Sequence, residues 1–219
     1  MKKAVIFDMD GVLIDSEPIY LENFRRFFRN NNVTISENDL LKTAGASSAQ
    51  IWRLVASLWP TPVEPAEIRA YYHKTHKKIE FNYKDLLFPD SINVLSELKR
   101  RNLVLALASS SSMKQIQTML KETETEKYFT HIVSGEMFSE SKPHPEIYLH
   151  TLENLGFEAN ECIAVEDSTY GIQSAKSAGI DTIAIRDTRF GYDQSLADYI
   201  IPSIGDILYL DILKPGSIN

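Results

Sequence analysis

The chain has 219 residues, of which 43% are hydrophobic and 24% are charged. This composition is ordinary for a folded globular protein and excludes a disordered or fibrous chain. The formal net charge of −7 argues against a nucleic-acid-binding surface, which needs a dominant basic field.

The first predicted element is a short buried strand at residues 4–7. This run is apolar and β-branched, it stops at Asp8, and Gly11 follows, so it favours a strand over a helix. Asp8 and Asp10 leave the end of this strand two residues apart, so both carboxylates can reach one site beyond the strand end. Two carboxylates at this spacing more often belong to a turn or a helix cap, so a catalytic role depends on which residues follow the other strands.

The segment 16–85 carries no convincing strand and reads as an inserted helical domain. Turn residues, such as those at 30–32 and 60–62, separate its helical patterns. The predicted helices cover residues 18–29, 37–43, 49–58 and 64–79. We therefore expect a helical cap at 16–85 and a core made of 1–15 and 86–219, with hinges near Asp15–Ser16 and near 87–89.

After the insertion, short apolar strands alternate with helical patterns. The predicted strands cover 103–108, 132–134, 163–165, 182–185 and 199–201, and the helices between them cover 91–101, 113–121, 145–155 and 169–178. This alternation predicts a parallel sheet covered on both faces. The expected fold class is α/β, with a Rossmann-like parallel sheet and an inserted all-helical cap.

The second strand ends in a run of four serines, Ser109 to Ser112, directly before a helix. Hydroxyls and free backbone N–H groups at a helix N-terminus form an anion site. Plain capping explains part of the run equally well, because Ser112 with Gln115 fits a capping box.

Two further motifs carry charge. Lys142 lies beside two prolines just before a helix, which makes it a positioned charge, although an exposed loop lysine is the commoner case. Glu166 and Asp167 follow the fourth strand and offer the hard oxygen ligands that Mg²⁺ prefers, although such acids also cap helices. The single cysteine, Cys162, cannot form an internal disulfide, and its apolar surroundings predict a buried thiol.

The ordered set is stronger than any one of its members. Four carboxylates from two strand ends cannot share a pocket uncompensated, because like charges raise one another's pKa. A divalent cation and Lys142 would remove that repulsion and would also neutralise the oxygens of a phosphoryl group.

This set resembles the haloacid dehalogenase superfamily of phosphotransferases, over essentially the whole chain. The first motif matches Asp8-Met9-Asp10-Gly11, and the others match Ser109, Lys142 and Glu166-Asp167. The runs Asp15-Ser16-Glu17-Pro18 and Glu166 to Ile172 look like the subgroup of β-phosphoglucomutase and small sugar-phosphate phosphatases, in which a helical cap is inserted after the first motif.

The resemblance implies a role for each motif. Asp8 is the nucleophile, and Asp10 is the acid and base. The implied phosphate-binding residues are Ser109, Ser110 and Lys142, and the implied Mg²⁺ site comprises Asp8, the Asp10 carbonyl, Asp167 and nearby Glu166. The function implied is a Mg²⁺-dependent phosphatase that hydrolyses small sugar or polyol phosphates through an aspartyl-phosphate.

In this subgroup the cap contacts the leaving group. The candidate contacts in this chain are Glu17, Tyr20, Gly45, Ser47 and Ser48. Where β-phosphoglucomutases carry a cap histidine and a cap-loop arginine, the chain offers Tyr20 and a neutral loop, with Arg53 as the nearest substitute cation. That departure favours hydrolysis over a phosphomutase, which is the alternative enzyme function.

Other interpretations fit less well. The basic run 73–78 reads as a solvated helix face, and Trp52 and Trp59 read as packing residues. A dehalogenase has no use for Asp10, and a receiver-type signalling module is about half as long and lacks a cap. No apolar run reaches transmembrane length, and we expect a cytoplasmic monomer that binds Mg²⁺ and a small phosphorylated substrate, and neither nucleic acid nor membrane.

Overall fold

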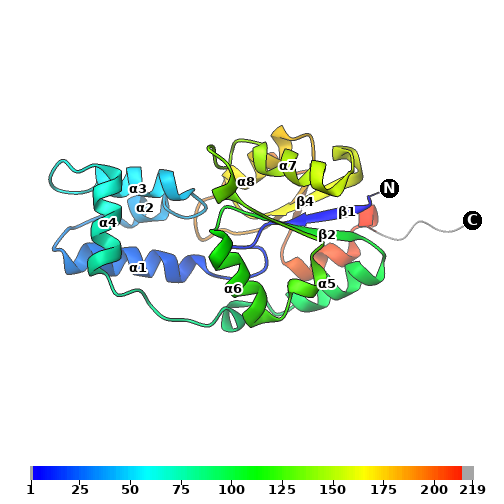
Figure 1. The fold of residues 1–219 in the computed structure, drawn as a ribbon, viewed down its shortest axis with the longest axis horizontal. Helices are drawn as coiled ribbons and strands as arrows, with labels where there is room; N and C mark the ends of the chain where they lie inside the picture. The colour runs from blue at the N-terminus through cyan, green and yellow to red at the C-terminus, as the bar shows by residue number, and fades with distance from the viewer. Residues whose placement is uncertain (1, 214–219) are drawn as a thin grey trace, which may run out of the picture.

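The computed structural model describes residues 2–213, which form a six-stranded parallel sheet flanked by helices, with a separate group of helices beyond one end of the sheet (Figure 1). The strand order is β3-β2-β1-β4-β5-β6. The strands are β1 (Ala4–Phe7), β2 (Val104–Ser109), β3 (His131–Ser134), β4 (Cys162–Glu166), β5 (Asp181–Ile185) and β6 (Tyr199–Ile201). The predicted α/β fold is confirmed.

Helices cover both faces of the sheet, as a parallel sheet requires. In Figure 1, α5 (Ser91–Arg100) and α6 (Met113–Thr123) lie below the sheet, and α7 (Glu146–Leu155) and α8 (Thr169–Ser177) lie above it. Short 3₁₀ turns complete this part: η1 (Tyr83–Leu86), η2 (Glu126–Tyr128), η3 (Gly135–Met137), η4 (Ala159–Glu161), η5 (Ile204–Tyr209) and η6 (Asp211–Leu213).

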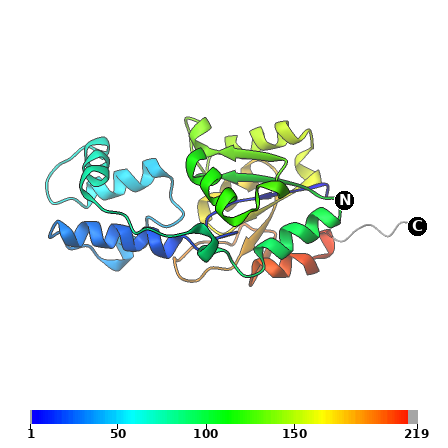
Figure 2. The same ribbon diagram turned by 60° about the horizontal axis from the view of Figure 1, so that its bottom comes forward.

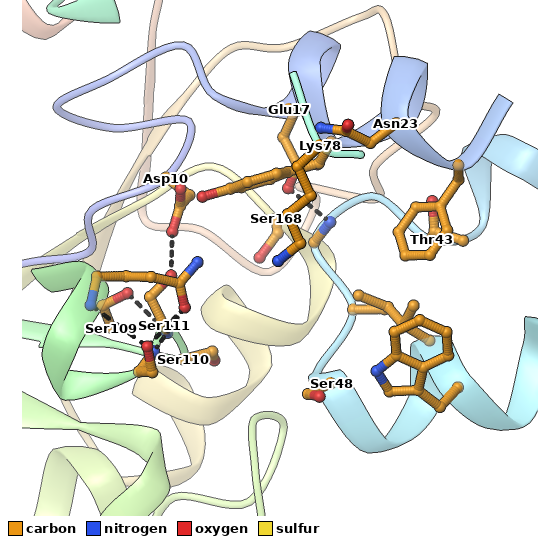
Figure 3. A pocket seen from close by; sticks show the side chains of 18 of the residues that line it. Asp10, Glu17, Asn23, Thr43, Ser48, Lys78, Ser109, Ser110, Ser111 and Ser168 are labelled. Carbon is orange, nitrogen blue, oxygen red and sulfur yellow. Dashed lines mark hydrogen bonds between the residues drawn. The ribbon is translucent and has the colours of Figure 1, made fainter. Parts of the chain in front are cut away.

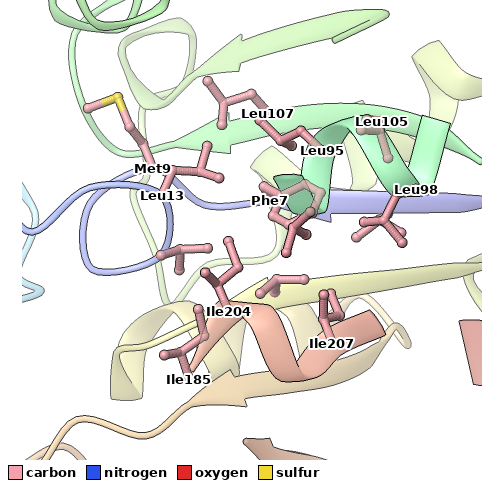
Figure 4. Close-up of a cluster of buried hydrophobic side chains, with 14 of the residues drawn as sticks. Phe7, Met9, Leu13, Leu95, Leu98, Leu105, Leu107, Ile185, Ile204 and Ile207 are labelled. Carbon is pink, nitrogen blue, oxygen red and sulfur yellow. The ribbon is translucent and has the colours of Figure 1, made fainter. Parts of the chain in front are cut away.

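The central strand β1 pairs with β2 on one side and β4 on the other. Its side chains alternate between two cores because successive residues of a strand face opposite sides. Val5 and Phe7 join the cluster under α5 and α6, drawn in Figure 4, while Ala4 and Ile6 join the cluster under α7 and α8. Both faces of β1 are therefore buried, which fixes the position of the residue that follows it.

The inserted helices are α1 (Glu17–Asn30), α2 (Glu37–Leu41), α3 (Ser48–Ser57) and α4 (Pro65–Thr75). They have a hydrophobic core of their own. Phe24, Phe27 and Phe28 recur at helical spacing on one face of α1 and pack against aromatic residues of α3 and α4. Trp52 lies edge-on to Phe24, and Trp59 stacks on Phe27 with ring centroids 5.4 Å apart, so both tryptophans pack in this core as predicted, and Trp52 also lines the cavity described below.

The chain crosses between the two parts along two segments that run side by side (Figure 2). The Asp15 amide donates to the Leu86 carbonyl oxygen, and the Phe88 amide donates to the Leu13 carbonyl oxygen. Ile14 and Leu87 form an antiparallel bridge between these bonds. The two crossings therefore form a short ribbon close to the end of β1, at the places where the hinges were predicted.

The largest departure from the predicted elements is the end of α4. The pattern predicted a helix to residue 79, but α4 ends at Thr75 and His76 takes an extended conformation. The Ile79 amide donates instead to the Asn23 side-chain oxygen on α1, at 2.9 Å. A buried amide on a neighbouring helix thus competes with the helical hydrogen bond, which no local pattern could reveal.

Candidate active site

Asp8 directly follows β1, and its amide still bonds to the Val165 carbonyl oxygen at 3.0 Å. Its carboxylate is buried, and the Lys142 ammonium donates to Asp8 Oδ1 at 2.8 Å and to Glu166 Oε1 at 2.6 Å. Burial alone would lower the pKa of Lys142, but the two carboxylates outweigh burial and raise it, so the side chain is cationic. Lys142 is therefore a positioned charge at the end of β1, as the sequence indicated, and not an exposed loop lysine.

The Asp10 carboxylate accepts hydrogen bonds from two serine hydroxyl groups. Ser16 donates to Asp10 Oδ1. Ser111 donates to Asp10 Oδ2 at 2.7 Å (Figure 3). Burial, with the nearby charge of Asp8, raises the pKa of Asp10 to about 6, while the two hydrogen bonds act in the opposite direction. Asp10 therefore titrates close to neutral pH, as a group that both gives and takes a proton must.

The serine run after β2 reaches the same place. Ser109 is buried at the strand end, and its hydroxyl accepts the Ser111 amide at 3.1 Å, while Ser110 is exposed toward the cavity. Ser112 caps α6 in the capping box expected with Gln115. Sequence reasoning assigned no role to Ser111, although the run that contains it was singled out.

Asp8, Glu166 and Asp167 bring carboxylate oxygens within 4.8 Å of one another. Burial raises the pKa of Asp167 well above its usual range, and the charges of Glu166 and Asp8 add to the effect. Glu166 Oε2 is buried without a hydrogen-bond partner among the described residues. Hard oxygen donors with uncompensated negative charge are the set that Mg²⁺ takes, so the residues fit this ion.

Gly11 allows this cluster to form. Its φ of +73° is strained for other residues, and a Cβ atom there would lie 2.0 Å from Asp167 Oδ2. The loop after β1 can therefore pass directly beside the second acidic pair only because residue 11 has no side chain.

Tyr148 on α7 is a site residue that sequence reasoning missed. It is fully buried, and its hydroxyl donates to Glu166 Oε1 at 2.6 Å. The Lys142 ammonium lies 5.3 Å from the centre of its ring. Tyr148 thus orients both charged groups from behind, but a tyrosine on the apolar face of a helix looks like any core residue in the sequence.

The site opens into a cavity of about 610 Å³ between the sheet ends and the inserted helices (Figure 3). Of the predicted residues, those that line it are Asp8, Asp10, Ser109, Ser110, Lys142, Asp167, Glu17, Tyr20, Gly45 and Ser48. Glu166 lies behind them and contacts Lys142. A cavity of this size accommodates a small metabolite.

The loop at Gly45 joins the two walls of the cavity. The Gly45 amide donates to Glu17 Oε1 at 3.0 Å, and a Cβ atom on Gly45 would lie 2.8 Å from the Ser168 side chain. Burial raises the pKa of Glu17 to about 8 against the effect of that hydrogen bond, with the charge of Asp10 adding to the rise. The Tyr20 hydroxyl is also buried and has no partner among the described residues.

Ser47, expected as a substrate contact, does not line the cavity. Its hydroxyl accepts the Gln50 amide and caps α3, and the Gln50 side chain bonds back to the Ser47 amide. Ser47 is therefore a helix cap, and the neighbouring Ser48 is the residue that reaches the cavity.

The expected cap cation requires a correction, but the basic run does not. The run is solvated as predicted, since His73, Lys74 and Lys78 are exposed, and His73 and Lys78 also line the cavity together with Arg69. Arg53, which was expected to be the nearest substitute cation, is exposed on α3 and is not among the cavity-lining residues. The early end of α4 explains the place of Lys78, because the segment after Thr75 bonds to Asn23 on α1, whereas Arg69 and His73 lie on α4 itself.

Comparison with known proteins identifies relatives over most of the chain. Residues 5–185 match the family model described as haloacid dehalogenase-like hydrolase. A phosphorylated carbohydrates phosphatase of Thermotoga maritima is 32% identical over 183 residues, which are 83% of this chain and 83% of that protein. Hexitol phosphatase B of Escherichia coli strain K12 is 29% identical over 219 residues and 96% of each chain.

Solved structures have the same fold. A β-phosphoglucomutase from Clostridium difficile superposes with a TM-score of 0.74 at 21% identity, over 94% of this chain and 93% of that one. At this identity the likeness concerns the fold, which includes both the sheet and the inserted helices. No helix among residues 2–213 is long and apolar enough to span a bilayer.

Proposed function

This chain belongs to the haloacid dehalogenase-like hydrolase family, and we propose that it is a Mg²⁺-dependent phosphatase of sugar or polyol phosphates that acts through an aspartyl-phosphate on Asp8. The observation that carries the proposal is the Asp8 carboxylate, bonded to Lys142 and facing a cavity that Asp10 also lines. The relatives named as phosphatases of phosphorylated carbohydrates and hexitols support the substrate class.

In the proposed reaction, Asp8 attacks phosphorus and Asp10 protonates the departing oxygen. Asp10 then takes a proton from the water that attacks the aspartyl-phosphate, which releases inorganic phosphate and restores Asp8. A pKa of about 6 suits Asp10 to both steps near neutral pH. Lys142 offsets the charge of the phosphoryl oxygens, while Ser109 and the Ser110 amide hold them.

Asp8, Asp167 and the Asp10 carbonyl would hold Mg²⁺, with Glu166 close behind. When bound, the ion supplies positive charge that offsets both the clustered carboxylates and the phosphoryl oxygens. We propose residues 16–85 as a cap domain that encloses the substrate. Within it, contacts to the leaving group would come from Glu17, Tyr20, Gly45 and Ser48, all of which line the cavity.

The test is phosphate release from a panel of sugar and polyol phosphates, with Mg²⁺ and with a chelator. Asp8→Asn should lower kcat by at least about 10³-fold while leaving the unfolding midpoint near the wild-type value. Asp85→Asn, at an exposed position in η1, is the matched control and should keep full activity. Substantial turnover by Asp8→Asn, or full activity in chelator, would contradict the mechanism.

A phosphomutase remains the alternative. The sequence argument against it was the lack of a cap cation at the site, and Arg69 and Lys78 remove that argument because both line the cavity. Incubation with β-glucose 1-phosphate, Mg²⁺ and a bisphosphate primer separates the two activities. We expect inorganic phosphate to accumulate faster than glucose 6-phosphate, and the reverse order would favour the mutase.

A further inference from the structure

The cap end of the cavity carries positive charge that has no carboxylate partner. Arg69 and Lys78 both line the cavity, and no ion pair joins either of them to an acid within residues 2–213. His73 lies beside them, and burial together with the charges of Lys78 and Arg69 lowers its pKa. Three basic side chains are thus close enough to repel one another at one end of a concave site.

The fold fixes the backbone segment that carries Lys78, whose side chain is exposed. The bond from the Ile79 amide to Asn23 Oδ1 ties the segment after α4 to α1, and the His76 ring lies 3.2 Å from the same oxygen. The Lys78 ammonium lies 5.9 Å from the centre of the Tyr72 ring, a distance at which a cation is attracted to an aromatic face. In Figure 3 the Lys78 side chain runs from this segment into the cavity.

The carboxylates of the cavity are at its other end. Asp8, Asp10 and Asp167 follow the strands of the sheet, and Glu17 begins α1 beside them. The core end therefore has the groups for a metal and a scissile phosphoryl, and the cap end has guanidinium and ammonium groups. A ligand that spans a cavity polarised in this way should carry negative charge at both ends.

We infer that Arg69 and Lys78 form an anion subsite for a second acidic group of the substrate, at the end remote from the phosphoryl group that is removed. This inference rests on the proposed phosphatase function and narrows its substrate class. The second group is a carboxylate or a second phosphate. Both accept hydrogen bonds from a guanidinium and an ammonium, and a sugar or polyol backbone would link the two ends.

Two substrate pairs test the subsite and distinguish its two ligands. 6-Phosphogluconate differs from sorbitol 6-phosphate by a terminal carboxylate, and fructose 1,6-bisphosphate differs from fructose 6-phosphate by a second phosphate. We expect at least one acidic member to have a KM about tenfold lower than its neutral partner, since a charge-assisted hydrogen bond contributes about this factor.

Lys78→Ala should remove that preference by raising the KM of the acidic member about tenfold, while the KM of the neutral member stays within about twofold. Lys78→Arg keeps the charge and should retain most of the preference. Lys74→Ala is the matched control, because Lys74 is exposed on α4 outside the cavity, and it should leave both KM values unchanged.

Calorimetric binding to Asp8→Asn makes the test independent of turnover. If this variant binds the acidic members no more tightly than the neutral ones, or if Lys78→Ala weakens both alike, the anion subsite is wrong. The phosphatase proposal then stands on its own hydrolysis data. Conversely, binding that depends on Lys78 without phosphate release by the wild type would uphold the subsite and contradict the phosphatase.

Discussion

Among single residues, Glu17 has a pKa that folding raises, and the pH dependence of the free energy of unfolding can measure this change. Burial, with the charges of Asp10 and Asp8, raises its pKa from 4.5 to about 8 even though the Gly45 amide donates to it. Between these two values the folded protein keeps a proton that the unfolded chain has lost. Its contribution to stability is therefore fully present below about pH 4.5 and is lost as the pH rises through about 8.

Glu17→Gln should remove this pH dependence, because the amide cannot ionise but can still accept the Gly45 N–H. We expect the variant to match the wild type near pH 5 and to exceed its free energy of unfolding by about 2–4 kcal/mol at pH 8.5. Urea unfolding at the two pH values, in chelator, measures the difference. Parallel pH curves for the two proteins, or an equal gain from the exposed control Glu80→Gln, would contradict the pKa shift.

Among single residues, the sequence predicted the polar groups that follow the strands and missed the residues that donate hydrogen bonds to them. Asp8, Lys142 and Asp167 were predictable because polar groups after apolar strands converge at one edge of a parallel sheet. Ser16, Ser111 and Tyr148 were not, since each matters through a hydrogen bond to a site carboxylate that depends on how the chain folds around it.

At the scale of elements, α8 begins against the acidic pair, and Gly171 in its first turn makes the contact. A Cβ atom at this position would lie 1.9 Å from Glu166 Oε2. Glu166 has no room to retreat, because it is fully buried and its other oxygen is bonded to Lys142 and Tyr148. The start of this helix and the carboxylate therefore constrain each other.

Gly171→Ala gives a test in which two effects have opposite signs. Helix propensity alone would stabilise the variant by about 0.5–1 kcal/mol. The clash with Glu166 predicts a loss of about 1–3 kcal/mol instead, with a higher Mg²⁺ concentration needed for half-maximal activity. Urea unfolding and a Mg²⁺ titration measure both, with exposed Ser177→Ala at the end of α8 as the control. A stabilised variant with unchanged Mg²⁺ dependence would refute the constraint.

The element boundaries show where sequence patterns suffice. Strands and core helices were predicted to within a few residues, because their apolar periodicity is local. The end of α4 was predicted four residues too late, because the bond that replaces the helical one comes from Asn23 on another helix. When a side chain on another helix takes a backbone amide out of a helix, the sequence of that helix carries no sign of it.

At the scale of the whole molecule, the loop 186–198 ties the sheet to the inserted helices. The Arg189 guanidinium donates two bonds of 2.9 Å to the Asp15 carboxylate at the hinge. Phe190 packs against the hydrophobic cluster of the inserted helices, and Tyr192 lies under Gly45. This loop belongs to the sheet by sequence, yet it contacts the helices in the arrangement seen in Figures 1 and 2.

Phe190→Ala should loosen this arrangement. Losing a half-buried ring costs about 1–2 kcal/mol of contact between the two parts, so the helices are held less firmly against the sheet unit and we expect KM to rise by up to about tenfold. The radius of gyration measured by X-ray scattering without substrate should also increase. Leu196→Ala, on an exposed side chain of the same loop, is the control. An unchanged KM and radius of gyration would indicate that the loop does not restrain the helices.

The ribbon at the hinge has a consequence for how such a molecule diversifies. Because Ile14 and Leu87 pair directly, the helical insertion begins and ends at adjacent points of the sheet unit. Its removal would leave a gap that a tight turn could close, and a different insertion could be spliced in without stretching β1. If the inserted helices select the substrate as proposed, recombination at these two positions would give new substrate ranges to an unaltered sheet unit.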